Sequence, residues 1–310
     1  MRSFAAALLI PLMTSALMPA NAFAQEAIAT GVATDPTAEV TLAVPPPRPI
    51  EYPVTFDVAD FEAKPWTKEF EWVIVVNRAD EGADRQSIRV YHNQQPVTYE
   101  EVASYLQNLT AQETMMNVKD ETMGERDARI QELAGKQWAP GVFKVSTGRN
   151  AFEAKGEHHS QHASWSVTPT GAFVPQRFEK KHKSESYSNK MCDSFFGRLV
   201  SALTRKELCT YMQNATFFNG GIALHKAIPG TEDALGGKAS GGCVRLPAAL
   251  AEYLFHVLDE ATGKPVPVVR NDGTVETTAT GDIVRETVST SPWGTLEARS
   301  ALIIVQDQVK

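Results

Sequence analysis

From residue 70 onward, the chain alternates between short apolar runs and polar turns. Residues 72–77 and 87–92 are rich in β-branched and aromatic side chains, and a polar turn separates them. The segment GVFKVSTG (141–148) alternates apolar and polar residues, and SWSVTPTGAFVPQRF contains two more short apolar runs around a turn. These patterns predict a mainly β, α+β fold.

Later apolar runs predict further strands. ATFFNGGIALH (215–225) predicts an apolar strand that Gly220 and Gly221 interrupt, as glycines do at a bulge or a close backbone approach. KPVPVV predicts another strand, and the terminal run ALIIVQDQ predicts a last strand or a segment docked on the surface.

Two regions have helical spacing instead. Residues 98–137 start with Thr98 and Glu101, the pattern of a capping box, and then repeat apolar residues at helical intervals. We expect two helices there, joined around residues 117–124 and inserted between strands. LPAALAEYLFHVLDEA (246–261) predicts a third helix, with Pro247 tolerated in its first turn.

The amino-terminal residues have the organisation of an export signal. Arg2 precedes an apolar run, and the small residues of ANA and AFA end at Ala22 and Ala24, as a signal peptidase requires. We therefore predict a signal peptide over 1–24 and an exported protein; a membrane anchor is the alternative. Residues 25–65, rich in Pro, Ala and Thr, predict an extended spacer.

Composition narrows the possible partners. The 310 residues are 43% hydrophobic and 22% charged, which is ordinary for a soluble globular protein of one or two domains. The formal net charge of -7 argues against a nucleic-acid partner, because phosphate binding needs clustered Lys and Arg.

Export determines how the three cysteines are interpreted. In an oxidising compartment, paired cysteines form disulfides and an odd one is a candidate reactive thiol. Cys192 and Cys209 lie near each other in a polar segment, whereas Cys243 follows two glycines in GKASGGCVRL. We predict a Cys192–Cys209 disulfide and a free Cys243; three reduced thiols are the alternative.

Cys243 has a candidate partner in His225, at the end of an apolar run. A nearby imidazole can take the proton of a thiol and so produce the nucleophilic thiolate. Gly241 and Gly242 allow backbone N–H groups to converge on an oxyanion, and a helix beginning after the cysteine would place the thiol near a positive helix end.

The ordered segments VSTG, TPTG, FFNGGIALHKA and SGGCVRL resemble the landmarks of the YkuD family of L,D-transpeptidases. The resemblance implies a β-sandwich or barrel catalytic domain over 66–270, with a helical insert at about 98–137 and a lid at about 178–212. A carboxy-terminal extension would then cover 271–310. It also implies an enzyme of the periplasm or cell envelope that needs no cofactor and no metal.

The family's mechanism carries over onto matching positions. The resemblance implies that Cys243 attacks the diaminopimelate–D-Ala bond of a peptidoglycan stem, that His225 moves the proton, and that amides of Gly241, Gly242 and Cys243 hold the oxyanion. The acyl group would pass to an amine, giving a 3–3 crosslink, an exchanged D-amino acid or an anchored outer-membrane protein, or else to water. Carbapenem inhibition is expected.

The support residues have alternative roles. Arg245 would order the turn or meet a stem carboxylate, or would be a surface residue at a helix start. Ser240 would orient the loop or His225, or would cap a helix.

Two departures from the family pattern keep a second hypothesis open. Gly241 stands where the family usually has a histidine, and Lys226 follows His225, where a cation could lower the pKa of the thiol or block an acceptor. The alternative is a non-catalytic peptidoglycan-binding module of the same fold.

The cluster His158, His159 and His162 resembles a metal motif but lacks a spaced carboxylate or cysteine, so we expect an exposed loop.

Overall fold

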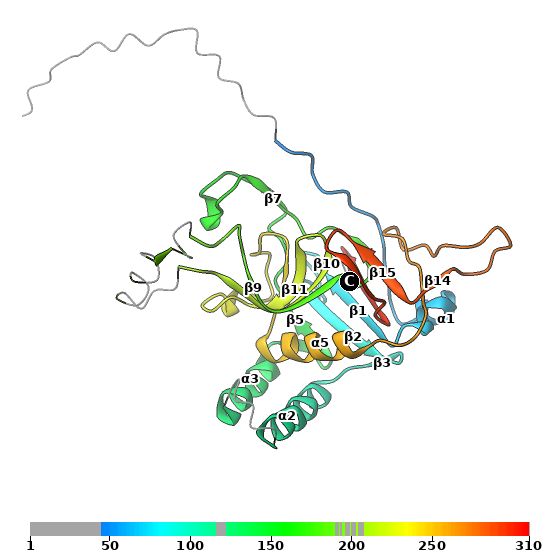
Figure 1. Ribbon diagram of the computed structural model, residues 1–310, viewed down its shortest axis with the longest axis horizontal. Helices are drawn as coiled ribbons and strands as arrows, with labels where there is room; N and C mark the ends of the chain where they lie inside the picture. The colour runs from blue at the N-terminus through cyan, green and yellow to red at the C-terminus, as the bar shows by residue number, and fades with distance from the viewer. Residues whose placement is uncertain are drawn as a thin grey trace, which may run out of the picture. The chain divides into compact units, whose positions relative to one another are not determined.

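The computed structural model describes residues 45–115, 122–189, 192, 194, 195, 199, 203 and 208–309 (Figure 1). The predicted signal peptide and the first part of the spacer lie outside the described residues. Before the insert the elements are α1 (Asp60–Ala63), β1 (Trp72–Asn77), β2 (Ser87–His92) and β3 (Gln95–Pro96). Then follow α2 (Tyr99–Met115), α3 (Met123–Gly135), β4 (Gln137–Ala139), β5 (Val142–Lys144), β6 (Ala151–Glu153), β7 (Ser164–Ser166), β8 (Gly171–Phe173) and β9 (Arg177–Lys183). The last elements are β10 (Tyr211–Asn219), β11 (Ile222–Lys226), β12 (Val244–Leu246), α5 (Ala248–Glu260), β13 (Val266–Pro267), β14 (Arg285–Glu286), β15 (Val288–Ser291), β16 (Gly294–Glu297) and β17 (Ala301–Gln306).

A seven-stranded sheet forms the centre, in the order β4-β5-β2-β1-β17-β8 with β3 paired to β2. Strands β1 and β17 run parallel, although they lie near opposite ends of the chain. Both are buried along their whole length, because alternate side chains enter two different hydrophobic clusters on the two faces. This explains why WVIVVN and ALIIVQ are continuous apolar runs.

A second sheet, β12-β11-β10-β9, packs against one face of the first together with α5. Helix α5 lies between the strands and the α2–α3 pair (Figure 1). The two helices of the insert therefore occur where the sequence predicted them, and they cover α5 rather than the site described below. A buried ion pair joins the insert to α5, from Arg126 to Glu252 at 3.0 Å.

The predicted spacer is wrong in its second part. Val54, Phe56 and Phe61 are buried against the outer face of the central sheet, in a cluster with Phe70 and Tyr91. These apolar side chains, together with the hydrogen bond from the Phe56 N–H to Gln306 Oε1 at 2.8 Å, hold this proline-rich segment on the sheet.

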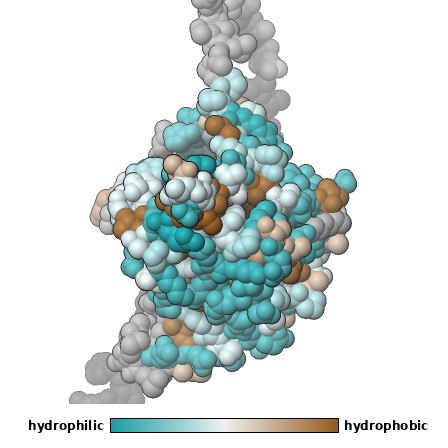
Figure 2. Space-filling view, turned by 90° about the vertical axis from the view of Figure 1, so that its right-hand side faces the viewer, coloured by the Kyte–Doolittle hydropathy of each residue, from teal (hydrophilic) through white to brown (hydrophobic). Residues whose placement is uncertain are grey.

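The carboxy-terminal region is also more than an extension, because β17 is an inner strand of the central sheet. Pro45–Lys310 accordingly forms a single compact unit, wider than the expected 66–270. Its face in Figure 2 is mainly hydrophilic, with hydrophobic side chains in small separate patches. Within the described residues, no helix combines the length and apolar character needed to cross a membrane.

Candidate functional site

Strands β11 and β12 place His225 and Cys243 on the same side of the second sheet. They pair in parallel, with His225 opposite Arg245, and Cys243 immediately precedes β12. Side chains two residues apart on a strand share a face, so Cys243, Arg245 and His225 all point towards one cavity. The expected helix directly after the cysteine is wrong: β12 intervenes before α5, so the thiol is not at a helix amino terminus.

Ser240 closes the turn that presents the thiol. Its hydroxyl donates to the carbonyl oxygen of Cys243 and accepts the N–H of Gly242 at 3.1 Å. Of the roles considered for Ser240, the structure therefore supports orientation of the loop. The same contact occupies the Gly242 amide, which was one of the expected oxyanion donors.

The VSTG and TPTG segments support this turn from outside. Ser146 and Gly148 form isolated bridges to Arg245 and Ser240. Thr168 Oγ1 donates to the carbonyl oxygen of Gly242 at 2.6 Å and accepts the Gly148 N–H at 2.8 Å. These landmarks are thus parts of one site that are distant in sequence.

The pair β10 and β11 completes the wall beside Cys243. The sequence predicted one strand interrupted by glycines, but Gly220 and Gly221 instead form a hairpin turn between two strands, with Gly220 at φ +54°. The carbonyl oxygen of Gly221 lies 3.7 Å from Cys243 Sγ. The backbone therefore approaches the thiol closely at this turn.

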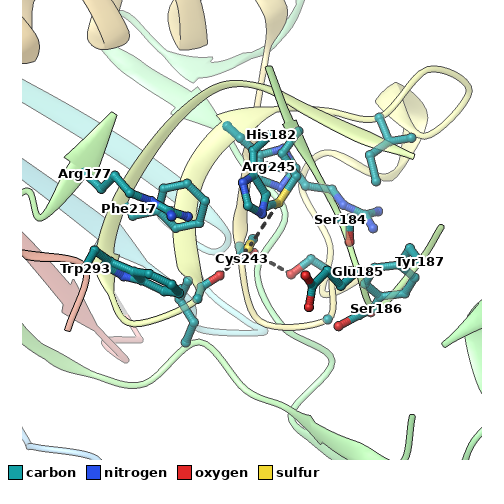
Figure 3. Close-up of a pocket in the computed structure, with 17 residues that line it drawn as sticks. Arg177, His182, Ser184, Glu185, Ser186, Tyr187, Phe217, Cys243, Arg245 and Trp293 are labelled. Carbon is teal, nitrogen blue, oxygen red and sulfur yellow. Dashed lines mark hydrogen bonds between the residues drawn. The ribbon is translucent and has the colours of Figure 1, made fainter. Parts of the chain in front are cut away.

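A cavity of about 430 Å³ opens at Cys243. In Figure 3, Arg177, Phe217 and Trp293 lie on one side of the cysteine, and the lid residues Ser184 to Tyr187 lie on the other. The remaining lining residues are His182, Met212, Gly221, Ile222, His225, Ile228, Ser240, Gly241 and Arg245.

The Cys243 thiol is neutral in this arrangement. Burial raises its pKa, opposed by a hydrogen bond from the Ala223 backbone and by the positive charge of Arg245. Sγ contacts Met212 Sδ at 3.8 Å and makes no hydrogen bond to His225. Cys243 and His225 therefore share a cavity but are not in direct contact through a hydrogen bond.

His225 is held as a neutral ring with one free nitrogen. Its Nδ1 lies 2.6 Å from the carbonyl oxygen of Lys226, and a carbonyl only accepts, so Nδ1 carries the proton and Nε2 is unprotonated. Burial, with the nearby charges of Arg245 and His182, lowers the pKa of His225 to about 4. The side chain is only 2% exposed.

The expected influence of Lys226 on the thiol is wrong. Adjacent residues of a strand point to opposite faces, and Lys226 lines a separate polar cavity near Arg126 and Glu252. Its contribution to the site is the backbone carbonyl that orients His225.

Arg245 is buried, 8% exposed, and not a surface residue at a helix start. Its guanidinium makes no hydrogen bond or ion pair with any residue that the structure describes, and burial lowers its pKa. It lines both the cavity at Cys243 and a neighbouring one.

Tyr187, from the lid, occupies the space beside Gly241. A Cβ atom on Gly241 would lie 2.8 Å from Tyr187 Cζ and would overlap its hydroxyl oxygen. A side chain at this motif position would therefore require the Tyr187 ring to move.

Two further parts of the site were missed by the sequence analysis. His182, on β9, provides a second imidazole in the cavity, with Nδ1 2.7 Å from Glu179 Oε2. Trp293, in the β15–β16 hairpin, encloses the Arg177 guanidinium together with Phe217, at 4.1 and 4.2 Å from the ring centroids. The lysine-rich start of the lid, EKKHK, contains His182 and could have indicated it as a residue of the site. The carboxy-terminal region has no comparable pattern around Trp293.

The lid is partly described and carries the predicted disulfide. Cys192 is bonded to Cys209, and Cys243 is free. The two flanks of the lid run together, with backbone bonds from Ser184 to Thr210 and from Asn189 to Leu208, each 2.9 Å.

The histidine cluster does not form a metal centre in the described part of the chain. No group of three His, Cys, Asp or Glu side chains there is arranged to hold a metal ion. His158 is exposed and lines the second cavity.

Residues 126–269 match the family model of YkuD, the L,D-transpeptidase catalytic domain. This part of the chain is similar to the catalytic domain of the YkuD family. The YkuD match includes the motif loop, His225 and the lid, but not β1, β2, β17 or Trp293. None of the curated proteins matches the chain.

Several solved structures are similar to the chain at low identity. L,D-transpeptidase 3 from Mycobacterium tuberculosis is 13% identical over 77% of this chain and 62% of its own, with a TM-score of 0.36. An L,D-transpeptidase from Mycobacterium smegmatis is 12% identical over 76% and 59%, with a TM-score of 0.34. One from Xylanimonas cellulosilytica is 11% identical over 76% and 60%, with a TM-score of 0.33. The chain thus spans about 60% of the length of these structures.

Proposed function

We propose that this protein is a peptidoglycan L,D-transpeptidase that uses Cys243 as its nucleophile. The observation that supports this most directly is that a free cysteine and a neutral histidine with an unprotonated Nε2 line one cavity in a YkuD domain. The predicted signal peptide and the disulfide favour export to the periplasm or cell envelope, where peptidoglycan stems are the substrate.

In the proposed first step, Cys243 Sγ attacks the carbonyl carbon of the diaminopimelate–D-Ala bond. Rotation of the thiol away from Met212 brings it to His225 Nε2, which takes the thiol proton. The C–N bond then breaks, and His225 returns the proton to the leaving amine of D-alanine. A thioester between the stem and Cys243 remains.

The oxyanion of this step needs backbone donors. Because the Gly242 amide already donates to Ser240, the proposal retains the amides of Gly241 and Cys243. Ser240 acts by holding the turn, and Arg245 acts on substrate carboxylate.

In the second step, an amine or water attacks the thioester and releases Cys243. A 3–3 crosslink, D-amino-acid exchange, anchoring of an outer-membrane protein and hydrolysis to a tripeptide all follow this chemistry. Incubation with a disaccharide-tetrapeptide and a D-amino acid other than alanine, followed by mass spectrometry of the products, distinguishes the crosslink, the exchanged stem and the tripeptide.

Acylation by a carbapenem tests the nucleophile. Imipenem is present in a structure of a similar L,D-transpeptidase. We expect intact-mass spectrometry to detect one imipenem adduct on the wild-type protein, none on Cys243→Ala, and slow formation on His225→Gln. Adduct formation on Cys243→Ala would contradict the proposal.

A binding module without turnover is the second candidate. It is favoured by the resting position of the thiol, which contacts Met212 and Gly221 and makes no hydrogen bond to His225. A folded wild-type protein that binds peptidoglycan but forms no adduct and no product would support this alternative.

A further inference from the structure

A second cavity, of about 620 Å³, adjoins the one at Cys243. Arg149, His158, Tyr187 and Arg245 line it, together with neutral residues. None of its described lining residues is Asp or Glu. The lining therefore contains two arginines and no carboxylate among the described residues.

The two arginines of this cavity differ in one respect. Arg149 pairs with Glu153 through both Nε and Nη2, whereas Arg245 has no carboxylate partner among the described residues. Arg245 is only 8% exposed, but none of its guanidinium nitrogens is both fully buried and unpaired, so these atoms face the cavity. A largely desolvated guanidinium without an ion-pair partner is costly. It is a strong site for a planar anion that accepts two hydrogen bonds, of which carboxylate is the best fit.

Tyr187 forms the wall between the two cavities. Its side chain lines both of them, its hydroxyl lies 3.4 Å from Arg149 Nη2, and it occupies the space beside Gly241. Arg245 also lines both cavities, so an anion on Arg245 would lie close to the Cys243 side of the wall.

We propose that the second cavity is a carboxylate site, in which Arg245 holds a molecule that carries its carboxylate on the same carbon as its amine. This deepens the proposed function, on which it rests for the reaction: the bound molecule is the acceptor. D-amino acids and the side-chain end of diaminopimelate have this chemistry, whereas a lysine side chain of a protein does not.

The acceptor step balances without another reagent. The neutral amine nitrogen attacks the thioester carbonyl, the C–S bond breaks, and the proton lost by the amine returns to the sulfur of Cys243 through His225. The carboxylate takes no part in bond formation. Its role on Arg245 is to place the adjacent amine next to the thioester, which raises the local concentration of the nucleophile.

Binding is measured first, on the full chain of Cys243→Ala, in which no chemistry occurs. NMR titration with D-alanine should shift the amide signals of Thr210 and Thr231, which line only the second cavity, and leave the indole signal of Trp293 unchanged. D-Alaninamide, which lacks the carboxylate, should bind at least tenfold more weakly. Equal binding of both, or shifts at Trp293 alone, would overturn the site.

Variants of Arg245 then test its role in binding. In the Cys243→Ala protein, Arg245→Gln should weaken D-alanine binding tenfold or more, and Arg245→Lys should retain part of the binding. Arg270→Gln, which changes an exposed arginine, is the matched control. Inorganic phosphate that binds as tightly as D-alanine would show a general anion site and contradict the acceptor assignment. If Arg245→Gln does not fold, the comparison of D-alanine with D-alaninamide still decides the question.

Kinetics separate this proposal from the proposed function. On the acylated wild-type enzyme, D-alanine should compete with water for the thioester far better than D-alaninamide at equal concentrations of free amine. Without any acylation, the proposed function fails while carboxylate binding still stands. Acylation with equal use of both amines would refute only the carboxylate site.

Discussion

The hydroxyl of Tyr187 occupies the position that a side chain at residue 241 would need. With Tyr187 in this position, the space at residue 241 fits glycine and does not fit the histidine that is usual in the YkuD pattern. The lid and the motif loop therefore lie in close contact, and a larger side chain at position 241 would displace Tyr187.

We expect Gly241→Ala to be destabilising and to slow acylation, because overpacking a close contact costs about 1–3 kcal/mol. The double variant Gly241→Ala with Tyr187→Gly should recover most of the lost free energy of unfolding in urea. A double variant as unstable as Gly241→Ala alone would mean that backbone strain, and not the tyrosine, excludes a side chain at this position.

Acid should destabilise the fold through His225. Its pKa is about 4 in the folded protein and near 6.5 in the unfolded chain, so the unfolded state binds more protons between these values. The stabilisation is complete above pH 6.5 and falls by about 3 kcal/mol as the pH drops to 4. Urea unfolding at a series of pH values should show this loss in wild type and a smaller one in His225→Gln. Parallel curves for the two proteins would contradict it.

The same pKa predicts the pH dependence of acylation. His225 must be unprotonated to accept the thiol proton, so the acid limb of the imipenem acylation rate should have its midpoint near pH 4 instead of 6.5. A midpoint near 6.5 would contradict the assignment of the buried His225 as the base.

His182 is expected to assist the second half of the reaction. Its Nδ1 faces Glu179, which orients the ring in the cavity. His182→Gln should slow release of the acyl group on the order of tenfold or more, with a smaller effect on acylation. Single-turnover mass spectrometry measures both steps. Equal slowing of both would point to a merely structural role.

We expect Trp293 to contribute more to the rate of acylation than to the free energy of unfolding. The side chain is half-exposed, but it packs on Arg177, and its Nε1 donates to the Gly220 carbonyl at 3.3 Å, in the turn beside the thiol. We expect Trp293→Ala to lower the acylation rate severalfold with a loss of about 1 kcal/mol or less in unfolding free energy. Trp293→Phe should fall between Trp293→Ala and wild type. The exposed Val288→Ala, in the same hairpin, is the control that should change neither quantity.

Removal of the lid disulfide should loosen the site without abolishing the fold. The bond closes a loop with a sequence separation of 17, for which about 3 kcal/mol of stabilisation is typical. In Cys192→Ser with Cys209→Ser, we expect faster proteolysis within the lid and slower acylation, while the central sheet is retained. Unchanged proteolysis would show that the backbone bonds of the lid flanks are sufficient.

Local sequence patterns were informative where neighbours in the chain determine structure. Runs rich in β-branched and aromatic residues predicted β1 and β2, alternation of apolar and polar residues predicted β5, and helical spacing predicted α2, α3 and α5. The motif around Cys243, with His225 upstream, identified the family. The prediction failed for the spacer, because it relied on the average composition of residues 25–65. Within that segment, Val54, Phe56 and Phe61 pack on the central sheet.

Residue identity and order were enough to indicate the family and to single out Cys243 as the candidate nucleophile, and the structure then confirmed the Cys192–Cys209 disulfide. The folded arrangement was needed to show that Lys226 faces away from the thiol, that Tyr187 fills the space at Gly241, and that Trp293 and His182 line the cavity. Those relationships join strands and loops that are far apart in the chain. The physical reason is that sheet register and packing, which bring such residues together, arise only when distant segments bury their apolar faces against each other.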